Sequence, residues 1–202
     1  MALKADLRRE YLRRRREIAP EEMEACSYKI ADLFFSQFDL RPGQTVHTFL
    51  PIKQQQEINT WPIVQHLWQL QVQVAVPISH AEDISMSHFL IFPETRFMEG
   101  RWGIPEPINA LPIPEAEIDL ALVPLLAFDL KGHRAGYGKG FYDRFLSLLP
   151  KTTIKVGLSL EPPVEIIDDV HPHDLPLDAV VTPTKVYRFP VAKPHTDASG
   201  NQ

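Results

Sequence analysis

An almost uninterrupted apolar segment, from Leu120 to Phe128, does most to constrain what this chain can fold into. A strand with one face in water alternates apolar and polar residues, whereas a strand covered on both faces is apolar nearly throughout. Strands of the second kind belong to parallel sheets with helices on both sides. We therefore expect Leu120 to Phe128 to form an inner strand of a largely parallel sheet.

The remaining periodicity alternates between helix and strand patterns. Helices are predicted at 2–17, 20–37, 60–70 and 141–149, and further strands at 45–50, 72–76, 87–92, 154–160 and 179–182. Pro77 is expected to stop the second of these strands, and residues 93–117 to form an ordered, extended surface segment. This alternation predicts a three-layer αβα domain with a Rossmann-like, largely parallel sheet over 1–192. A polar tail at 193–202 is expected to be disordered.

Composition excludes several classes of protein. The 202 residues carry a formal net charge of -5, which does not favour nucleic acid or an anionic membrane as a partner. The single cysteine, Cys26, cannot form an intramolecular disulfide, as expected in a reducing compartment. We find neither an apolar run long enough to cross a bilayer nor a signal-peptide pattern. We expect a cytoplasmic, monomeric protein that acts on small molecules.

The strongest chemical signal is the glycine-rich segment from Gly132 to Asp143, which follows the apolar strand and precedes a helix. Ligands of open α/β sheets bind at this end of the strands. Gly136, Gly138 and Gly140 allow positive φ and close backbone approach, while backbone N–H groups at a helix start suit phosphate. Arg134 and Lys139 add positive charge on either side. We interpret the segment as a phosphate-binding loop, with a flexible glycine turn as the alternative.

The segment matches neither of two well-defined phosphate-binding patterns, the Walker A loop and the dinucleotide-binding loop. It lacks the Gly-Lys-Ser/Thr ending of a Walker A loop, and its G-x-G-x-G spacing differs from the G-x-G-x-x-G dinucleotide pattern. Asp143 falls in the first turn of the following helix. Its carboxylate could stabilise the helix dipole, or it could bind Mg²⁺ together with phosphate oxygens, and spacing alone leaves both interpretations open.

The predicted N-terminal helix is rich in basic residues. They are Lys4, Arg8, Arg9, Arg13, Arg14, Arg15 and Arg16. Lys4 and Arg8 are four residues apart and therefore project from one face, which could close over a phosphate tail. For residues 13–16 we favour a solvated face.

Three further residues have two interpretations each. Glu57, at the end of a polar loop, is either a surface residue or a ligand-binding carboxylate. Asp174 lies in His-Pro-His-Asp at 171–174, which invites a zinc interpretation, but the spacing suits chelation poorly. Trp102 is either part of the core or one wall of a flat aromatic pocket.

The segment AFDLKGHRAGYGKGFYDRFL, at 127–146, closely resembles the signature of the 5-formyltetrahydrofolate cyclo-ligase family. Supporting similarities are the Lys4-x-x-x-Arg8 helix, FLPIKQQQEINT at 49–60, WGIPEP at 102–107 and HDLPLDAVVTPT at 173–184. Together these segments span nearly the whole chain in the expected order. Ala135 departs from the pattern, which usually has leucine there, and this change affects packing more than charge.

The resemblance implies an ATP- and Mg²⁺-dependent enzyme. It would convert 5-formyltetrahydrofolate to 5,10-methenyltetrahydrofolate, with phosphorylation of the formyl oxygen, ring closure by N10, and release of ADP and phosphate. The implied ATP-binding residues are Lys4, Arg8, Arg134, Gly136, Tyr137, Gly138, Lys139, Gly140, Phe141 and Tyr142, and among them Arg134 and Lys139 are the candidate catalytic residues. The implied folate contacts are Leu50 or Ile52, Glu57, Trp102 and Tyr142. Asp143 and Asp174 would hold Mg²⁺, directly or through water.

Other classes of function remain as alternatives. The chain could be another nucleotide-dependent α/β enzyme, such as a small kinase or a ligase for a different formyl or carboxyl substrate. It could also be a catalytically silent relative that binds folate or nucleotide. A nucleic-acid-binding module using the basic N-terminal helix is disfavoured by the acidic remainder of the chain.

Overall fold

The structure is a computed structural model that describes residues 1–190, so the predicted tail at 193–202 lies outside the described residues. The helices are α1 (Lys4–Glu17), α2 (Pro20–Gln37), α3 (Trp61–Gln69) and α4 (Phe141–Leu148). The strands are β1 (Thr45–His47), β2 (Gln73–His80), β3 (Ser85–Ile91), β4 (Phe97–Glu99), β5 (Pro105–Pro107), β6 (Leu111–Ile113), β7 (Leu120–Pro124), β8 (Ala127–Phe128), β9 (Arg134–Ala135), β10 (Ile154–Leu158), β11 (Ala179–Val181) and β12 (Val186–Arg188). Short 3-10 helices cover Lys53–Gln55, Arg101–Gly103 and Glu115–Glu117.

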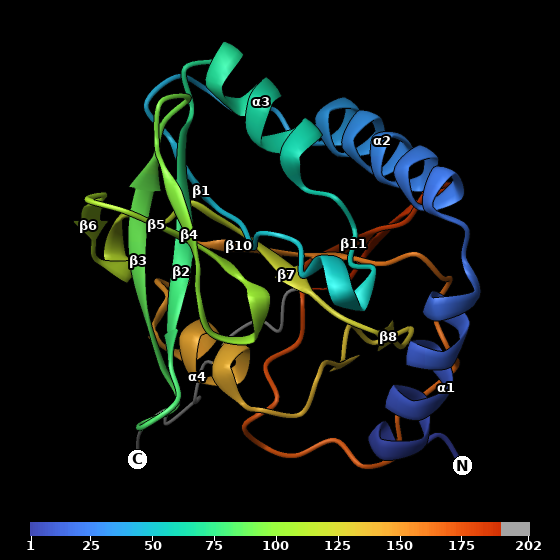
Figure 1. The fold of residues 1–202 in the computed structure, drawn as a ribbon. Coiled ribbons are helices and arrows are strands. Elements are labelled where there is room, and N and C mark those ends of the chain that lie inside the picture. The colour runs from blue at the N-terminus through green and yellow to red at the C-terminus, as the bar shows by residue number, and fades with distance from the viewer. Residues whose placement is uncertain (191–202) are drawn as a thin grey trace, which may run out of the picture.

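A single large sheet organises the described part of the chain (Figure 1). Its strand order is β12-β11-β10-β7-β1-β2-β3-β6. The inner strands β11, β10, β7, β1 and β2 run parallel to one another. At the edges the pairing is antiparallel: β12 pairs with β11, β3 pairs with β2, and β6 pairs with β3. The predicted, largely parallel sheet is therefore confirmed, with antiparallel strands at both edges.

Helices cover the sheet on both faces, as the apolar pattern of β7 predicts. Leu120 and Leu122 point into a core shared with Ile30 and Phe34 of α2 and with residues of α3. The alternate residues of β7 belong to a second core, which includes Phe145 of α4. Because successive side chains of a strand point to opposite faces, one strand contributes to both cores. This arrangement confirms the three-layer αβα fold.

The apolar run does not form one long strand. β7 ends at Pro124, and the chain then folds into a separate hairpin of β8 and β9. Leu7 of α1 packs against this hairpin through Ala127 and Ala135. Ala127 and Ala135 are covered by α1, whereas Phe128 packs into the core beside α4, with its ring 5.3 Å from that of Tyr187 of β12. Because the hairpin is buried in this way, its first strand looks as apolar in sequence as a sheet strand.

Pro77 does not stop the second strand as predicted. β2 continues to His80, and Pro77 pairs with His88 of β3. β1 pairs with β2 only as far as Ala75, so Pro77 lies in a stretch of β2 that has a partner strand on one side only. Proline is tolerated in such positions because its missing N–H breaks no ladder on the open side.

Three other segments extend or qualify the predictions. The start of α2 is as expected, with Pro20 in the first turn and Glu21 and Glu22 near the positive end of the helix dipole. The surface segment at 93–117 contains the β4–β5 hairpin and also supplies β6 to the edge of the sheet. The edge strand β12 was not predicted.

Within residues 1–190, we find no helix that is both long and apolar enough to cross a membrane.

A histidine is completely buried beside the core formed with α4. His47 of β1 is inaccessible to solvent, and its ring lies 4.5 Å from that of Phe145 and 4.9 Å from that of His88. Neither ring nitrogen has a hydrogen-bond partner among the described residues. Burial, and secondly the nearby His88, lower the pKa of His47 well below its ordinary value. His88 itself faces Glu115, whose carboxylate lies 3.6 Å away.

We predict that this histidine makes the fold sensitive to acid. The unfolded chain binds a proton near pH 6.5, whereas folded His47 stays neutral, so stability is lost as the pH falls below that value, by up to ~1.4 kcal/mol per pH unit. Urea unfolding at pH 7.5 and pH 5.0 measures this loss. His47→Phe should reduce it, while His173→Gln, at an exposed position, should leave it unchanged. Equal pH dependence in His47→Phe and the parent protein would contradict this account.

Candidate functional site

A cavity of about 660 Å³ opens where the carboxyl ends of β1 and β7 lie side by side. From β1 the chain continues to β2 on one side, and from β7 it continues to β10 on the other. Loops that leave adjacent strands in opposite directions create a crevice, which is the usual ligand site of such sheets. The cavity is lined by the loop after β1, the glycine-rich loop, α1 and the turn containing Trp102.

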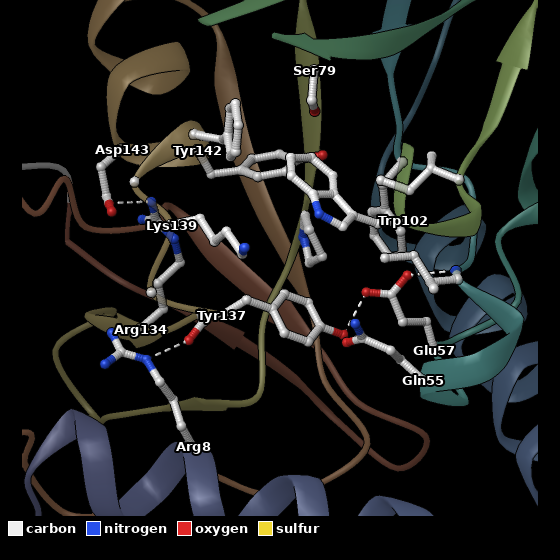
Figure 2. A pocket seen from close by; sticks show the side chains of 18 of the residues that line it. Arg8, Gln55, Glu57, Ser79, Trp102, Arg134, Tyr137, Lys139, Tyr142 and Asp143 are labelled. Carbon is white, nitrogen blue, oxygen red and sulfur yellow. Dashed lines mark hydrogen bonds and ion pairs between the residues drawn. The ribbon is translucent and has the colours of Figure 1, made fainter. Parts of the chain in front are cut away.

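The glycine-rich loop forms one side of the cavity (Figure 2). Gly136 to Gly140 connects β9 to α4, and its residues line the cavity together with Arg134 and Asp143. Gly138 and Gly140 have φ of 83° and 81°, which side chains tolerate poorly, but Gly136 does not adopt a positive φ as expected. Gly140 is the N-cap of α4 and supplies no side-chain acceptor. The first N–H groups of α4 therefore lack a side-chain cap and suit an anion.

Gly132 does not belong to this loop, contrary to the prediction for the whole segment 132–143. It lies between β8 and β9, with φ of 86°. A Cβ at this position would lie 2.9 Å from the carbonyl oxygen of Leu177 and 2.8 Å from the ring of Phe189. Gly132 is thus required for a tight turn and close packing, not for a ligand.

Two of the predicted basic residues, Arg134 and Lys4, are paired with the two predicted metal-binding aspartates. Arg134 is buried and donates to Asp143 Oδ1 at 2.5 Å and to the carbonyl of Leu175 at 2.7 Å. Burial lowers the pKa of the Arg134 guanidinium, and the carboxylates of Asp143 and Asp174 oppose that shift. A buried guanidinium is stable only with such partners. Asp143 therefore has a role beyond the dipole of α4.

Lys4 and Arg8 close the cavity from α1, as their shared helix face predicts. The Lys4 ammonium forms an ion pair with Asp174. Burial disfavours ionisation of Asp174, but hydrogen bonds from Lys4 and from the His171 N–H outweigh it, so its pKa is lowered. Arg8 Nε donates to the carbonyl of Gly136 at 2.7 Å. α1 is thereby fastened to both the glycine-rich loop and the segment before β11.

These two carboxylates suit a divalent cation that arrives with phosphate. Asp143 and Asp174 line the same cavity as the glycine-rich loop. Within residues 1–190 there is no group of three or more His, Cys, Asp or Glu that could hold a metal ion. Mg²⁺ needs fewer protein ligands than that, because it binds one or two carboxylates together with water and phosphate oxygens.

Trp102 forms a wall of the cavity rather than part of the core. It is 40% exposed and lines the cavity, with its ring 5.9 Å from that of Phe141 at the start of α4. The Lys139 ammonium is 5.0 Å from the centre of the Trp102 ring, within cation–π distance. Trp102 has φ of 62°, which is unfavourable for a residue with a side chain. Of the two interpretations made from the sequence, the structure supports the aromatic wall.

Glu57 lies at the other end of the cavity and is almost completely buried (Figure 2). Its Oε1 accepts a hydrogen bond from the Tyr137 hydroxyl at 2.5 Å, and its Oε2 accepts one from the Ile52 N–H at 2.7 Å. Burial raises the pKa of Glu57, and these hydrogen bonds oppose the shift. Leu50 and Ile52 both line the cavity, as does Tyr142. Glu57 is therefore not a surface residue.

Arg15 is the functional candidate that sequence analysis missed. We predicted a solvated face for residues 13–16, and this holds for Arg13 and Arg14, which are exposed and paired with Glu10. Arg15 is only 6% exposed and donates to the Tyr137 hydroxyl and to the carbonyl of Leu125. Its position seven residues after Arg8 places both on one helix face. The seven-residue spacing from Arg8 could have identified Arg15 in the sequence, but the adjacent arginines made all four residues look alike.

Comparisons with known proteins agree with this geometry. The 5-formyltetrahydrofolate cyclo-ligase family matches residues 1–183. The 5-formyltetrahydrofolate cyclo-ligase of Escherichia coli K12 is 31% identical over 180 residues, covering 87% of this chain and 98% of the relative. That of Mycolicibacterium smegmatis is 29% identical over 196 residues, covering 90% and 94%. The solved structure of Aquifex aeolicus 5,10-methenyltetrahydrofolate synthetase superposes with a TM-score of 0.72 at 26% identity, covering 98% of this chain and 99% of that one.

We predict that Gly138→Ala separates binding from stability. A Cβ at Gly138 would lie 3.0 Å from the Arg8 guanidinium carbon, whereas one at Gly43, which also has a positive φ, would meet nothing within 4 Å. Both alanine variants should lose about 1–2 kcal/mol of stability from the backbone conformation. Gly138→Ala should in addition weaken ATP binding about tenfold, because it displaces Arg8 and crowds the loop. Calorimetry and urea unfolding measure the two effects, and equal ATP affinities would refute the prediction.

Proposed function

The chain belongs to the 5-formyltetrahydrofolate cyclo-ligase family, and we propose that it uses ATP and Mg²⁺ to convert 5-formyltetrahydrofolate to 5,10-methenyltetrahydrofolate. ADP and phosphate are the other products. The observation that carries the proposal is the division of one cavity into two unlike halves. One half is glycine-rich and cationic, the other contains the buried carboxylate of Glu57, and the aromatic wall formed by Trp102 meets Lys139 where the two halves adjoin.

The cationic half suits the triphosphate of ATP. Lys4, Arg8, Arg134 and Lys139 surround the glycine-rich loop, and α4 begins at its end. Arg presents a planar pair of donors to phosphate oxygens, and Lys presents a point charge. The proposed ATP-binding set is the one implied by the sequence, namely Lys4, Arg8, Arg134, Gly136, Tyr137, Gly138, Lys139, Gly140, Phe141 and Tyr142.

The other half suits the flat pterin ring of the folate. Glu57 uses two acceptor positions within the protein, and an ionised carboxylate has about four, so others remain for N–H donors of the pterin. Trp102 offers an aromatic face, while Leu50 and Ile52 offer apolar surface. Tyr142 lies between the two halves, where its ring can contact either substrate.

The chemistry requires a good leaving group, because a formamide oxygen leaves poorly. The formyl oxygen attacks the γ-phosphorus of ATP, the bond from that phosphorus to the bridging oxygen breaks, and ADP departs. N10 then attacks the formyl carbon and loses its proton, and the carbon–oxygen bond breaks to release phosphate. The protein contributes positioning and charge neutralisation, for which we assign Arg134 and Lys139 as the catalytic residues.

Asp143 and Asp174 are proposed to hold Mg²⁺, directly or through water. When bound, Mg²⁺ neutralises phosphate charge. In the structure the same carboxylates form ion pairs with Arg134 and Lys4. Binding of ATP with its cation would therefore give each charged group a new partner. Lys4 and Arg134 would pair with phosphate oxygens, and the two carboxylates would face the cation, so no charge would be left unpaired. This exchange avoids the cost of leaving a buried charge alone.

The test is a spectroscopic assay of the purified protein. With 5-formyltetrahydrofolate, Mg²⁺ and ATP, the near-ultraviolet absorbance of methenyltetrahydrofolate should rise with one ADP formed per product molecule. Omission of ATP should abolish the rise. If both ligands bind but no product forms, the chain is instead a catalytically silent relative that binds folate or nucleotide.

We predict a specific loss from Lys139→Met. Removing a cation that neutralises developing phosphate charge should lower kcat/KM for ATP about a hundredfold. Lys151→Met is the matched control, because Lys151 is an exposed lysine in the turn after α4 and does not line the cavity. The control should keep the parent's kinetics. Equal rates in the two variants would remove Lys139 from the catalytic assignment.

A further inference from the structure

Three side chains form a continuous hydrogen-bonded connection, of which Tyr137 and Glu57 line the cavity and Arg15 belongs to α1. Arg15 Nη1 donates to the Tyr137 hydroxyl at 2.8 Å. That hydroxyl donates to Glu57 Oε1 at 2.5 Å (Figure 2). The connection is anchored at both ends. Arg15 Nη2 donates to the carbonyl of Leu125, directly after β7, and Glu57 Oε2 accepts from the Ile52 N–H.

The direction of this connection is fixed by chemistry. A guanidinium can only donate hydrogen bonds, so the Tyr137 oxygen must accept from Arg15. The single hydroxyl proton is then directed to Glu57, which as a carboxylate can only accept. Arg15 and Glu57 are both less than 9% exposed, and the hydroxyl between them gives each charge a buried partner. Removal of the hydroxyl would leave both groups without that partner.

The position of Tyr137 joins the two halves of the site. Its backbone belongs to the glycine-rich loop, between Gly136 and Gly138, while its hydroxyl reaches the carboxylate at the opposite end. Arg8 holds the Gly136 carbonyl next to it. Any ligand that orders the loop therefore also restrains the Tyr137 ring, and with it the orientation of the Glu57 carboxylate.

We infer that Arg15 and Tyr137 are positioning residues that hold Glu57 for the pterin and couple its binding to that of ATP. This inference rests on the proposed function, because it assumes that phosphate binds the loop and the pterin binds Glu57. Coupling is reciprocal: if ATP tightens folate binding by some factor, folate tightens ATP binding by the same factor. The two substrates thereby favour the complex in which both are present.

Tyr137→Phe tests the coupling, because it keeps the ring and removes only the hydroxyl. The affinity of 5-formyltetrahydrofolate is measured by calorimetry with and without a non-hydrolysable ATP analogue, for the parent and the variant. We expect the variant to bind the folate about tenfold more weakly, as for loss of a hydrogen bond to a charged group. We also expect the analogue to change that affinity far less than in the parent. The affinity for the analogue alone should change less than the affinity for the folate, because the loop backbone and the aromatic ring of residue 137 remain.

Arg15→Met provides a second test from the other end of the connection, and Arg15→Lys keeps the charge without the two-pronged geometry. Both should raise the KM for 5-formyltetrahydrofolate more than the KM for ATP, with Arg15→Lys the milder. Tyr11→Phe and Arg14→Met are the matched controls, because both residues lie on α1, as Arg15 does, but neither forms a hydrogen bond to Tyr137 or Glu57 within the described residues. Both controls should behave as the parent.

The outcomes separate this inference from the proposed function. If the parent forms methenyltetrahydrofolate but Tyr137→Phe binds folate as the parent does, with the same response to the ATP analogue, the coupling is absent and the inference is wrong. A uniform loss of stability with unchanged affinities would make the connection merely structural and also overturn it. If the parent forms no product, the proposed function fails instead, whatever the variant does.

Discussion

The parallel pairing of β1 with β7 is the constraint on which the site depends. These strands end side by side, but the chain leaves them in opposite directions across the sheet, so their loops separate and a cavity opens between them. The loop after β1 brings Glu57, and the segment after β7 brings the glycine-rich loop. Residues distant in sequence therefore meet, and the Tyr137 side chain connects the two loops through the hydrogen bond that its hydroxyl donates to Glu57.

Charge pairing is the second organising feature. Lys4 and Arg134 are largely buried, and each faces an aspartate rather than solvent. These pairs keep the basic side chains and the carboxylates in place and avoid isolated buried charges. A ligand that carries both phosphate and a cation can offer each basic side chain a new anionic partner and each carboxylate a new cationic one. On this basis we propose that the site favours a nucleotide together with its cation over either component alone.

Much of this account was accessible from sequence, for identifiable physical reasons. The apolar run at 120–128 indicated a doubly covered sheet, and the spacing of Lys4 and Arg8 indicated one helix face. Other predictions were wrong because the roles of those residues depend on contacts with segments distant in sequence. Gly132 was assigned to the ligand loop because a turn glycine and a ligand-binding glycine look the same in sequence, and only packing against Phe189 distinguishes them. Arg15 looked solvated because its neighbours are, and its partners lie more than a hundred residues away.

The central claim is that the glycine-rich loop presents ATP to the formyl oxygen of the folate, which then leaves as part of phosphate. The most direct measurement uses 5-formyltetrahydrofolate labelled with oxygen-18 in its formyl group, with the isotopic composition of the released phosphate read by mass spectrometry. The account predicts that each phosphate released with methenyltetrahydrofolate carries one labelled oxygen. Unlabelled phosphate, formed at the same rate as product, would contradict it, because the formyl oxygen would then have left by another route.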